Sequence, residues 1–253
     1  MNDMHVHTKY SCDSQAEIES YCPEAIKKGV HTVCFTEHID YNINDYGYGY
    51  YSAKEFFDDF LAVKEKYKNK LDLLCGVEFS EPHLYQDQLL KYANMPYDYI
   101  IGGVHYWYND IFPSQMIKEN LPAEICYEYY WDTVLKAVEA GGFDCLGHLD
   151  FPKRYYKQLI VDFAKVHEIF NGMVKKNICL EINTSSLRKG VPESMPDKEI
   201  LSVYKSCGGK YITIGSDAHS AGELAADYSY AKDLTDFFDF KEVILKQRKM
   251  FVK

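Results

Sequence analysis

The sequence predicts an α/β protein folded as a distorted, TIM-barrel-like (β/α)7 barrel. Seven short apolar runs, of the kind that form buried parallel strands, alternate with longer amphipathic stretches. The chain has 253 residues, a length typical of one β/α barrel. Because no linker, repeat or low-complexity segment interrupts it, we expect residues 1–253 to form a single domain. An open, doubly wound sheet is the alternative fold.

Each expected strand is short and rich in β-branched or aromatic residues. The strands are expected at residues 4–6, 32–36, 71–77, 97–104, 143–147, 178–182 and 211–215. Helices are expected near 16–28, 53–69, 84–94, 122–140, 158–176 and 197–207, with others after 221, and the basic end 246–253 is expected as a solvated last helix. Residues 40–52 and 107–122 are irregular and long enough to cover a functional site.

The composition limits the environment and the partners of the chain. No stretch approaches the roughly 18 to 20 apolar residues that a membrane span needs, and the first residues lack a basic segment followed by an apolar one, so we expect a cytoplasmic protein without a membrane partner. A formal charge of −10 disfavours binding to nucleic acid. The eight cysteines are scattered without a Cys-x-x-Cys pair, which indicates buried, reduced thiols.

Histidines and carboxylates stand at the carboxyl ends of the expected strands. His5 and His7 end the first strand, where residues two apart face the same side. Further candidates end the later strands or follow the first one, and the whole set is His5, His7, Asp13, His38, Glu78, His105, His148, Asp217 and His219. In a parallel barrel those ends meet at one face, where active sites of this architecture lie.

This set of side chains predicts a metal centre. A single strand-end histidine is more often a packed core residue, but six imidazoles side by side would leave buried nitrogens unpaired without a cation or an acid. Nitrogen and oxygen donors without thiolates suit Zn, Mn or Fe(II) and argue against a structural zinc site. Nine candidates exceed the needs of one ion, so two or three divalent ions sharing a carboxylate are expected. Such clusters stabilise phosphoryl transfer, which predicts a phosphomonoesterase.

The same residues resemble the polymerase-and-histidinol-phosphatase (PHP) superfamily. The resemblance lies in His5-x-His7-Thr8-x-x-Ser11-x-Asp13-Ser14, Thr36-Glu37-His38, Gly76-Val77-Glu78, Gly103-Val104-His105-Tyr106, Gly147-His148-Leu149-Asp150 and Gly215-Ser216-Asp217-Ala218-His219, in order from residue 5 to about residue 220. Residues 147–154 and 183–188 are similar to those of the stand-alone histidinol-phosphate phosphatases, which hydrolyse L-histidinol phosphate to L-histidinol and phosphate in histidine biosynthesis.

The resemblance implies three metal positions and assigns a ligand set to each. His5, His7, Glu78 and Asp217 would hold one ion; Glu78, His105 and His148 a second; Asp13, His38 and His219 a third. Glu78 would bridge the first two ions. We hypothesise that a hydroxide bridging these two ions attacks the phosphorus atom in line.

Other residues are candidates for contacts with the substrate. Arg188 is the first choice for the phosphate and Arg154 the second, because a guanidinium matches phosphate oxygens. Asp217 or His38 would manage the proton of the leaving group. Glu37, Asp40 and Glu81 could accept from a cationic substrate, and the tyrosines of 44–51 could line a lid, but we interpret these three acids as ordinary solvated loop residues. We interpret the remaining histidines as structural or surface residues: His31, His83 and His167.

Two alternative functions remain open from the sequence. The chain could be another PHP phosphoesterase, acting on nucleotides, DNA ends or phosphotyrosine. It could also be a non-catalytic metal-binding scaffold, although such a module has no need to keep the whole ligand set. Nothing in the sequence indicates an oligomeric state.

Overall fold

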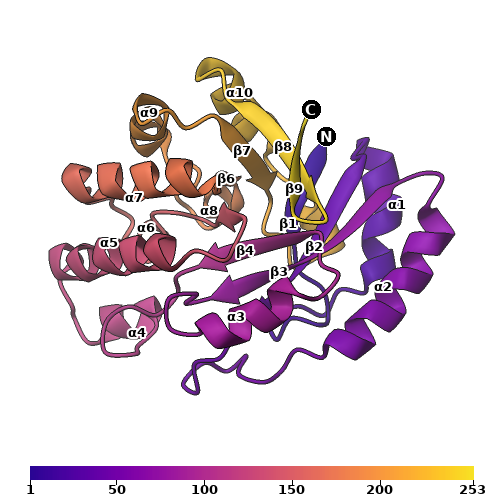
Figure 1. Cartoon of the computed structure of the whole chain (residues 1–253), viewed down its shortest axis with the longest axis horizontal. Helices are drawn as coiled ribbons and strands as arrows, with labels where there is room; N and C mark the ends of the chain where they lie inside the picture. Colours follow the sequence, from indigo (N-terminus) through magenta and orange to yellow (C-terminus); the bar gives the residue numbers. More distant parts are fainter.

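The strands follow one another around a single sheet in chain order, with helices packed outside them (Figure 1). The structure is a computed structural model that describes residues 1–253. Strands β1 to β8 pair in parallel, and β9 pairs antiparallel with β8. The strands are β1 (Asn2–Val6), β2 (Thr32–Ile39), β3 (Asp72–Ser80), β4 (Tyr99–Gly103), β5 (Cys145–Leu146), β6 (Cys179–Asn183), β7 (Tyr211–Gly215), β8 (Lys241–Lys246) and β9 (Lys249–Val252).

The sheet closes between β1 and β7 at their carboxyl ends. The backbone N–H of His7 donates to the carbonyl of Ala218 and that of Asp217 to the carbonyl of His5, each over 2.8 Å. At the amino ends β8 pairs with β7 instead, and its Glu242 accepts from the Asn2 side chain of β1 over 2.8 Å. The insertion of β8 on one side distorts the barrel. The predicted distorted barrel is confirmed, and the strand order shows no reversal of the kind that a doubly wound sheet requires.

The helices occupy the segments between strands, and most lie where amphipathic patterns predict them. They are α1 (Ile18–Lys28), α2 (Ala53–Tyr67), α3 (Gln86–Ala93), α4 (Pro113–Lys118), α5 (Ala123–Ala140), α6 (Lys153–Tyr156), α7 (Phe163–Lys176), α8 (Ser185–Arg188), α9 (Lys198–Ser206) and α10 (Tyr228–Phe237), with a 3-10 turn at Ala221–Glu223. Local signals fix several ends. Asp197 caps α9 by accepting from the N–H groups of Glu199 and Ile200, and Gly29 ends α1 in the left-handed conformation.

Two hydrophobic cores lie on opposite faces of the strands. The smaller core fills the barrel interior with inward side chains from most strands, including Met4, Cys34, Tyr99, Cys145 and Cys179. The larger core lies between the strands and the surrounding helices. Small cysteine side chains suit the narrow interior, and all eight cysteines of the chain are free, as the sequence predicts.

The C-terminal segment forms a β-hairpin, so the helix expected at 246–253 is wrong. Strands β8 and β9 are joined by Gln247 and Arg248, both with positive φ, which is the backbone of a tight hairpin turn. The hairpin lies across the amino ends of the barrel, where Arg248 donates to both carboxylate oxygens of Asp144 over 2.9 and 2.8 Å. Val243, Ile244 and Leu245 of β8 complete the interior core.

None of the helices has both the length and the apolar character that a membrane span requires.

We expect Arg248→Ala to lower the free energy of unfolding by about 1–3 kcal/mol, because it leaves the largely buried Asp144 carboxylate without its cationic partner. Urea denaturation followed by circular dichroism measures the change. Lys249→Ala is the matched control, because Lys249 is exposed on the same hairpin. Equal stability of the two variants would show that the ion pair does not anchor the hairpin.

Candidate metal centre

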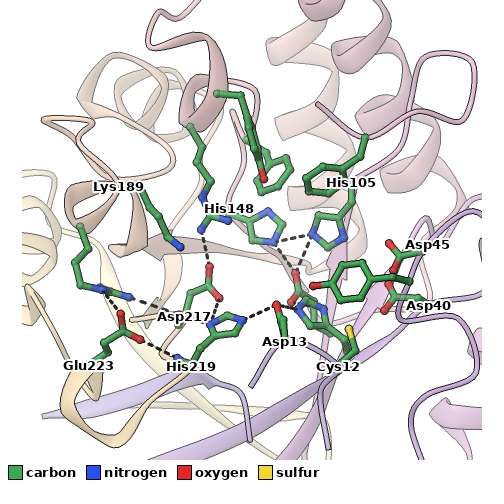
Figure 2. Close-up of a pocket in the computed structure, with 18 residues that line it drawn as sticks. Cys12, Asp13, Asp40, Asp45, His105, His148, Lys189, Asp217, His219 and Glu223 are labelled. Carbon is green, nitrogen blue, oxygen red and sulfur yellow. Dashed lines mark hydrogen bonds and ion pairs between the residues drawn. The ribbon is translucent and has the colours of Figure 1, made fainter. Parts of the chain in front are cut away.

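Nine side chains from six strand ends and one loop converge at the carboxyl face of the barrel. Strand register accounts for part of this convergence, since His38 of β2 lies beside Glu78 of β3 in the parallel pair. His105 and His148 lie two residues beyond the last residues of β4 and β5, and the closure of β1 on β7 brings the N-terminal histidines against the segment after β7. The face opens into a pocket of about 410 Å³ (Figure 2).

The nine side chains form three groups, two of which share His7. Within each group the potential ligand atoms lie within 4.8 Å of one another. The groups are His5, His7 and Asp217; Glu78, His105 and His148; and His7, Asp13, His38 and His219. They are close to the three sets that the PHP resemblance implies, with His7 shared between two groups.

Glu78 lies at the centre of the cluster. One carboxylate oxygen is 2.5 Å from Nε2 of His148 and 3.3 Å from Nε2 of His105. The other is 3.1 Å from Nε2 of His5 and 3.3 Å from Nδ1 of His38. Burial opposes ionisation of Glu78, but the surrounding imidazoles, His5 first, hold its pKa well below the ordinary value. A buried carboxylate surrounded in this way is suited to bridge two cations.

The hydrogen bonds of the imidazoles show that the donor set fits metal ions. Nδ1 of His5 lies 2.6 Å from Glu181, and Nδ1 of His7 lies 3.1 Å from the Ser11 hydroxyl. When both rings are neutral with their protons on Nδ1, the Nε2 atoms of His5 and His7, 3.0 Å apart, both carry lone pairs and cannot hydrogen-bond to each other. A cation between such lone pairs removes this conflict. The nitrogen and oxygen donors are those that Zn, Mn and Fe(II) accept.

Sharp backbone turns direct two of the candidate ligands inward. His148 and Asp217 have φ values of 25° and 54°, an uncommon region for residues other than glycine. Each is held by backbone contacts, because the N–H of His148 donates to Glu181 over 2.7 Å and the N–H of Asp217 donates to His5. The preceding Gly215 is required for space, since a Cβ atom there would lie 2.2 Å from the Glu181 carboxylate.

Both predicted phosphate-binding arginines line the pocket, on short helices that the sequence did not reveal. Arg154 of α6 donates to Asp217 over 2.9 Å, and Arg188 of α8 donates to the carbonyl of Ser216 over 2.6 Å. Nη1 of Arg188 is buried without a hydrogen-bond partner, and its Nε lies 3.5 Å from a carboxylate oxygen of Glu223. Lys189 lies beside them and is a pocket residue that sequence reasoning missed.

The interpretation of three acids as solvated loop residues is wrong. Glu37 is fully buried and accepts from Thr8 and Ser11, because the loop after β1 folds over it. Glu81 is also buried, and burial raises its pKa to about 7. Asp40 is half-buried and lines the pocket.

Sequence reasoning also missed one acid and placed other residues correctly. It missed Glu181, whose only signal was a charged residue inside an apolar strand. Tyr46 of the expected lid lines the pocket. The three histidines interpreted as structural or surface residues lie outside its lining: His31, His83 and His167.

The fold and this cluster define a class, the β/α barrels with a histidine- and carboxylate-rich site for several metal ions. The PHP domain family matches residues 3–185. A Thermotoga maritima protein, "Probable histidinol-phosphatase", is 30% identical to this chain. The alignment covers 99% of this chain and 97% of the Thermotoga protein. The histidinol-phosphatase of Lactococcus lactis is 29% identical over 87% of this chain and 84% of its own.

A solved structure also resembles the whole chain. The histidinol phosphate phosphatase of Lactococcus lactis, complexed with zinc, L-histidinol and phosphate, superposes with a TM-score of 0.80 at 25% identity, covering 99% of this chain and 98% of that one. The chain belongs to the PHP family.

We expect metal affinity to rise with pH between about 6 and 8, by about tenfold per pH unit for each imidazole proton displaced. Burial alone would lower the pKa of His38 and His219, but Glu78 and Asp13 raise these values above the ordinary one in the metal-free protein. Both imidazoles therefore carry protons that a metal ion must displace. Competition with a chromophoric chelator, corrected for its own protonation, measures the affinity. A flat profile would contradict the assignment of these imidazoles as ligands.

Proposed function

We propose that this protein is a metal-dependent phosphomonoesterase that hydrolyses L-histidinol phosphate to L-histidinol and phosphate. Similarity over nearly the whole chain to histidinol-phosphatases supports the proposal, as does the resemblance to a solved structure that holds zinc, L-histidinol and phosphate. The reaction belongs to histidine biosynthesis, and we place it in the cytoplasm.

The observation that carries the substrate assignment is the division of charge across the pocket. Arg154, Arg188 and Lys189 line the pocket, with Glu223 beside Arg188, and Asp40 and Asp45 also belong to its lining. Figure 2 shows Lys189 and the two aspartates on opposite sides of the histidines. A substrate with an anionic phosphate at one end and a cationic group at the other matches this arrangement. Histidinol phosphate has both, because it carries an ammonium group.

We propose that three divalent ions, Mn, Zn or Fe, occupy the cluster with the ligand sets that the PHP resemblance implies. When bound, such ions supply positive charge to phosphoryl oxygens and lower the pKa of coordinated water. The donor chemistry and the three compact groups support this number of ions. The carboxylate of Glu78, with each oxygen facing different imidazoles, supports its assignment as the shared ligand.

Side chains of the protein bind the phosphate and position the reacting groups. Nη1 of Arg188, which is buried without a hydrogen-bond partner, is available to the phosphate oxygens, and Arg154 reaches the pocket beside Asp217. Burial raises the pKa of Asp217, but contact with His7 and the charges of His5 and Arg154 outweigh burial and hold it well below the ordinary value. An ionised Asp217 of such low basicity is suited to hold a metal ion and to orient Arg154. His38 lies on the pocket wall but is assigned to the third ion, so it serves as a ligand and not as the acid for the leaving alkoxide.

A panel of phosphomonoesters tests the proposed substrate. We expect kcat/KM for histidinol phosphate to exceed that for nucleotides and phosphotyrosine, because nucleotides lack a cationic end and phosphotyrosine carries a carboxylate beside its ammonium group. Asp45→Asn should lower kcat/KM for histidinol phosphate by roughly fivefold, from about 1 kcal/mol for a partly exposed ion pair, and leave p-nitrophenyl phosphate unaffected. Phosphate release measures both.

Asp58→Asn, on the exposed face of α2, is the control for a general charge effect. A preference for a nucleotide or phosphotyrosine would overturn the substrate assignment. Bound metal without turnover of any phosphomonoester would favour a non-catalytic scaffold.

Replacement of Arg188 tests the phosphate contact. We expect Arg188→Ala to lower kcat/KM by about 10²- to 10³-fold for every phosphomonoester, because it removes donors aimed at the transferring group. Arg188→Lys should retain part of the activity, since it keeps the charge but loses the planar fork. Bound metal, measured by plasma emission spectroscopy, should match the wild-type protein. Unchanged kcat/KM in the alanine variant would remove Arg188 from the mechanism.

A further inference from the structure

Two serine hydroxyls each lie between a carboxylate and an imidazole of the metal cluster. Ser11 donates to Glu37 over 2.6 Å and lies 3.1 Å from Nδ1 of His7. Ser80 donates to Asp40 over 2.6 Å and lies 3.0 Å from Nδ1 of His105. Both serines are buried, with 0% and 1% of their surface exposed. In both arrangements the order is carboxylate, serine hydroxyl and imidazole Nδ1.

The hydrogen atoms around Ser11 can be assigned from its partners. The backbone N–H of His38 donates to the Ser11 oxygen over 3.0 Å. The single hydroxyl proton is directed to Glu37, whose other contacts are the N–H and hydroxyl donors of Thr8. The remaining lone pair of the serine oxygen can only accept, so His7 must present an Nδ1 proton to it. His7 is thereby held in the tautomer whose Nε2 lone pair faces the cluster.

Strand geometry explains why a serine stands between Glu37 and His7. Successive residues of a strand point to opposite faces, and Cys34 of β2 belongs to the interior core while Val33 and Phe35 belong to the outer one. Glu37 therefore points outward with Val33 and Phe35, away from the pocket. The Ser11 hydroxyl, supplied by the loop after β1, connects this carboxylate to the imidazole.

The second arrangement follows from the register of β2 and β3. Ile39 pairs with Phe79, which places Asp40 next to Ser80 one residue further on. Ser80 in turn pairs with Gly103, two residues before His105. The carboxylate, the hydroxyl and the imidazole thus come from three neighbouring strand ends. By contrast, His5 reaches its carboxylate, Glu181, directly.

We propose that Ser11 and Ser80 are positioning residues that relay the negative charge of Glu37 and Asp40 to two metal-ligand imidazoles. Each relay fixes the Nδ1 proton outward, orients the ring and keeps the Nε2 lone pair directed at the ions. Such outer partners typically change metal affinity by about 10- to 100-fold when they are removed. The inference rests on the proposed ligand set, and it does not depend on which phosphomonoester is the substrate.

The two relays serve different parts of the cluster. His105 belongs only to the group with Glu78 and His148, whereas His7 belongs to both of the other groups. Loss of the Ser80 hydroxyl should therefore weaken metal binding in the Glu78 group, and loss of the Ser11 hydroxyl should weaken it in the groups that contain His7.

Zinc retention against a competing chelator tests the proposal. We expect Ser80→Ala to bind one zinc ion about 10- to 100-fold more weakly than the wild-type protein. Ser80→Thr, which keeps a hydroxyl, should restore the affinity. Ser194→Ala is the matched control, because Ser194 is also buried but donates only to the carbonyl of Pro196. Ser80→Cys, whose thiol is a weaker acceptor, provides the same comparison if the alanine variant does not fold.

A second readout separates a positioning role from a merely structural one. In the zinc-loaded protein, the Nδ1 protons of His7 and His105 should give slowly exchanging, downfield proton resonances, and Ser11→Ala or Ser80→Ala should remove the matching signal. Zinc affinity and resonances equal to wild type in both alanine variants would overturn the relays and leave the ligand set intact. A wild-type protein that retains no zinc, manganese or iron would instead refute the ligand set itself.

Discussion

The pairing of β1 with β7 at their carboxyl ends is the constraint on which the site depends. Two backbone hydrogen bonds join residues about 210 positions apart. They place His5 and His7 next to Asp217 and His219. His5, His7 and Asp217 form one of the compact groups, and His7 and His219 belong to another. At the other end of the barrel, β8 lies between the same two strands. The barrel is thus narrow where the ligands meet and wider where only hydrophobic packing is required.

Around this junction, the buried charged groups are arranged in two layers. Imidazoles and carboxylates occupy the centre, and hydroxyl, amide and carboxylate groups hold their outer atoms. Glu181 shows the arrangement most clearly, because its two oxygens contact the His5 ring and the N–H of His148. A buried carboxylate used in this way costs solvation energy, and the imidazole and N–H groups that contact it offset that cost. The contacts within the site therefore compensate the desolvation of the polar groups that the fold buries.

The sequence allowed prediction of features that follow from periodicity and from strand ends. The barrel class and the convergence of His38, Glu78 and His105 could be foreseen, because parallel strands place their carboxyl ends at one face. The hairpin could not, because its turn uses Gln247 and Arg248, which lack the glycine or asparagine that marks such turns. Burial of Glu37 was also hidden, since it depends on how the loop after β1 folds over the strand.

The order of the ligands along the chain has a consequence for biosynthesis. The Glu78, His105 and His148 group is complete as soon as residue 148 has left the ribosome, whereas the other two groups require Asp217 or His219. A nascent chain can therefore assemble one group long before the barrel closes. On the proposed ligand sets, the remaining groups are complete only after β7 has docked on β1, so full loading with metal would follow folding of nearly the whole polypeptide.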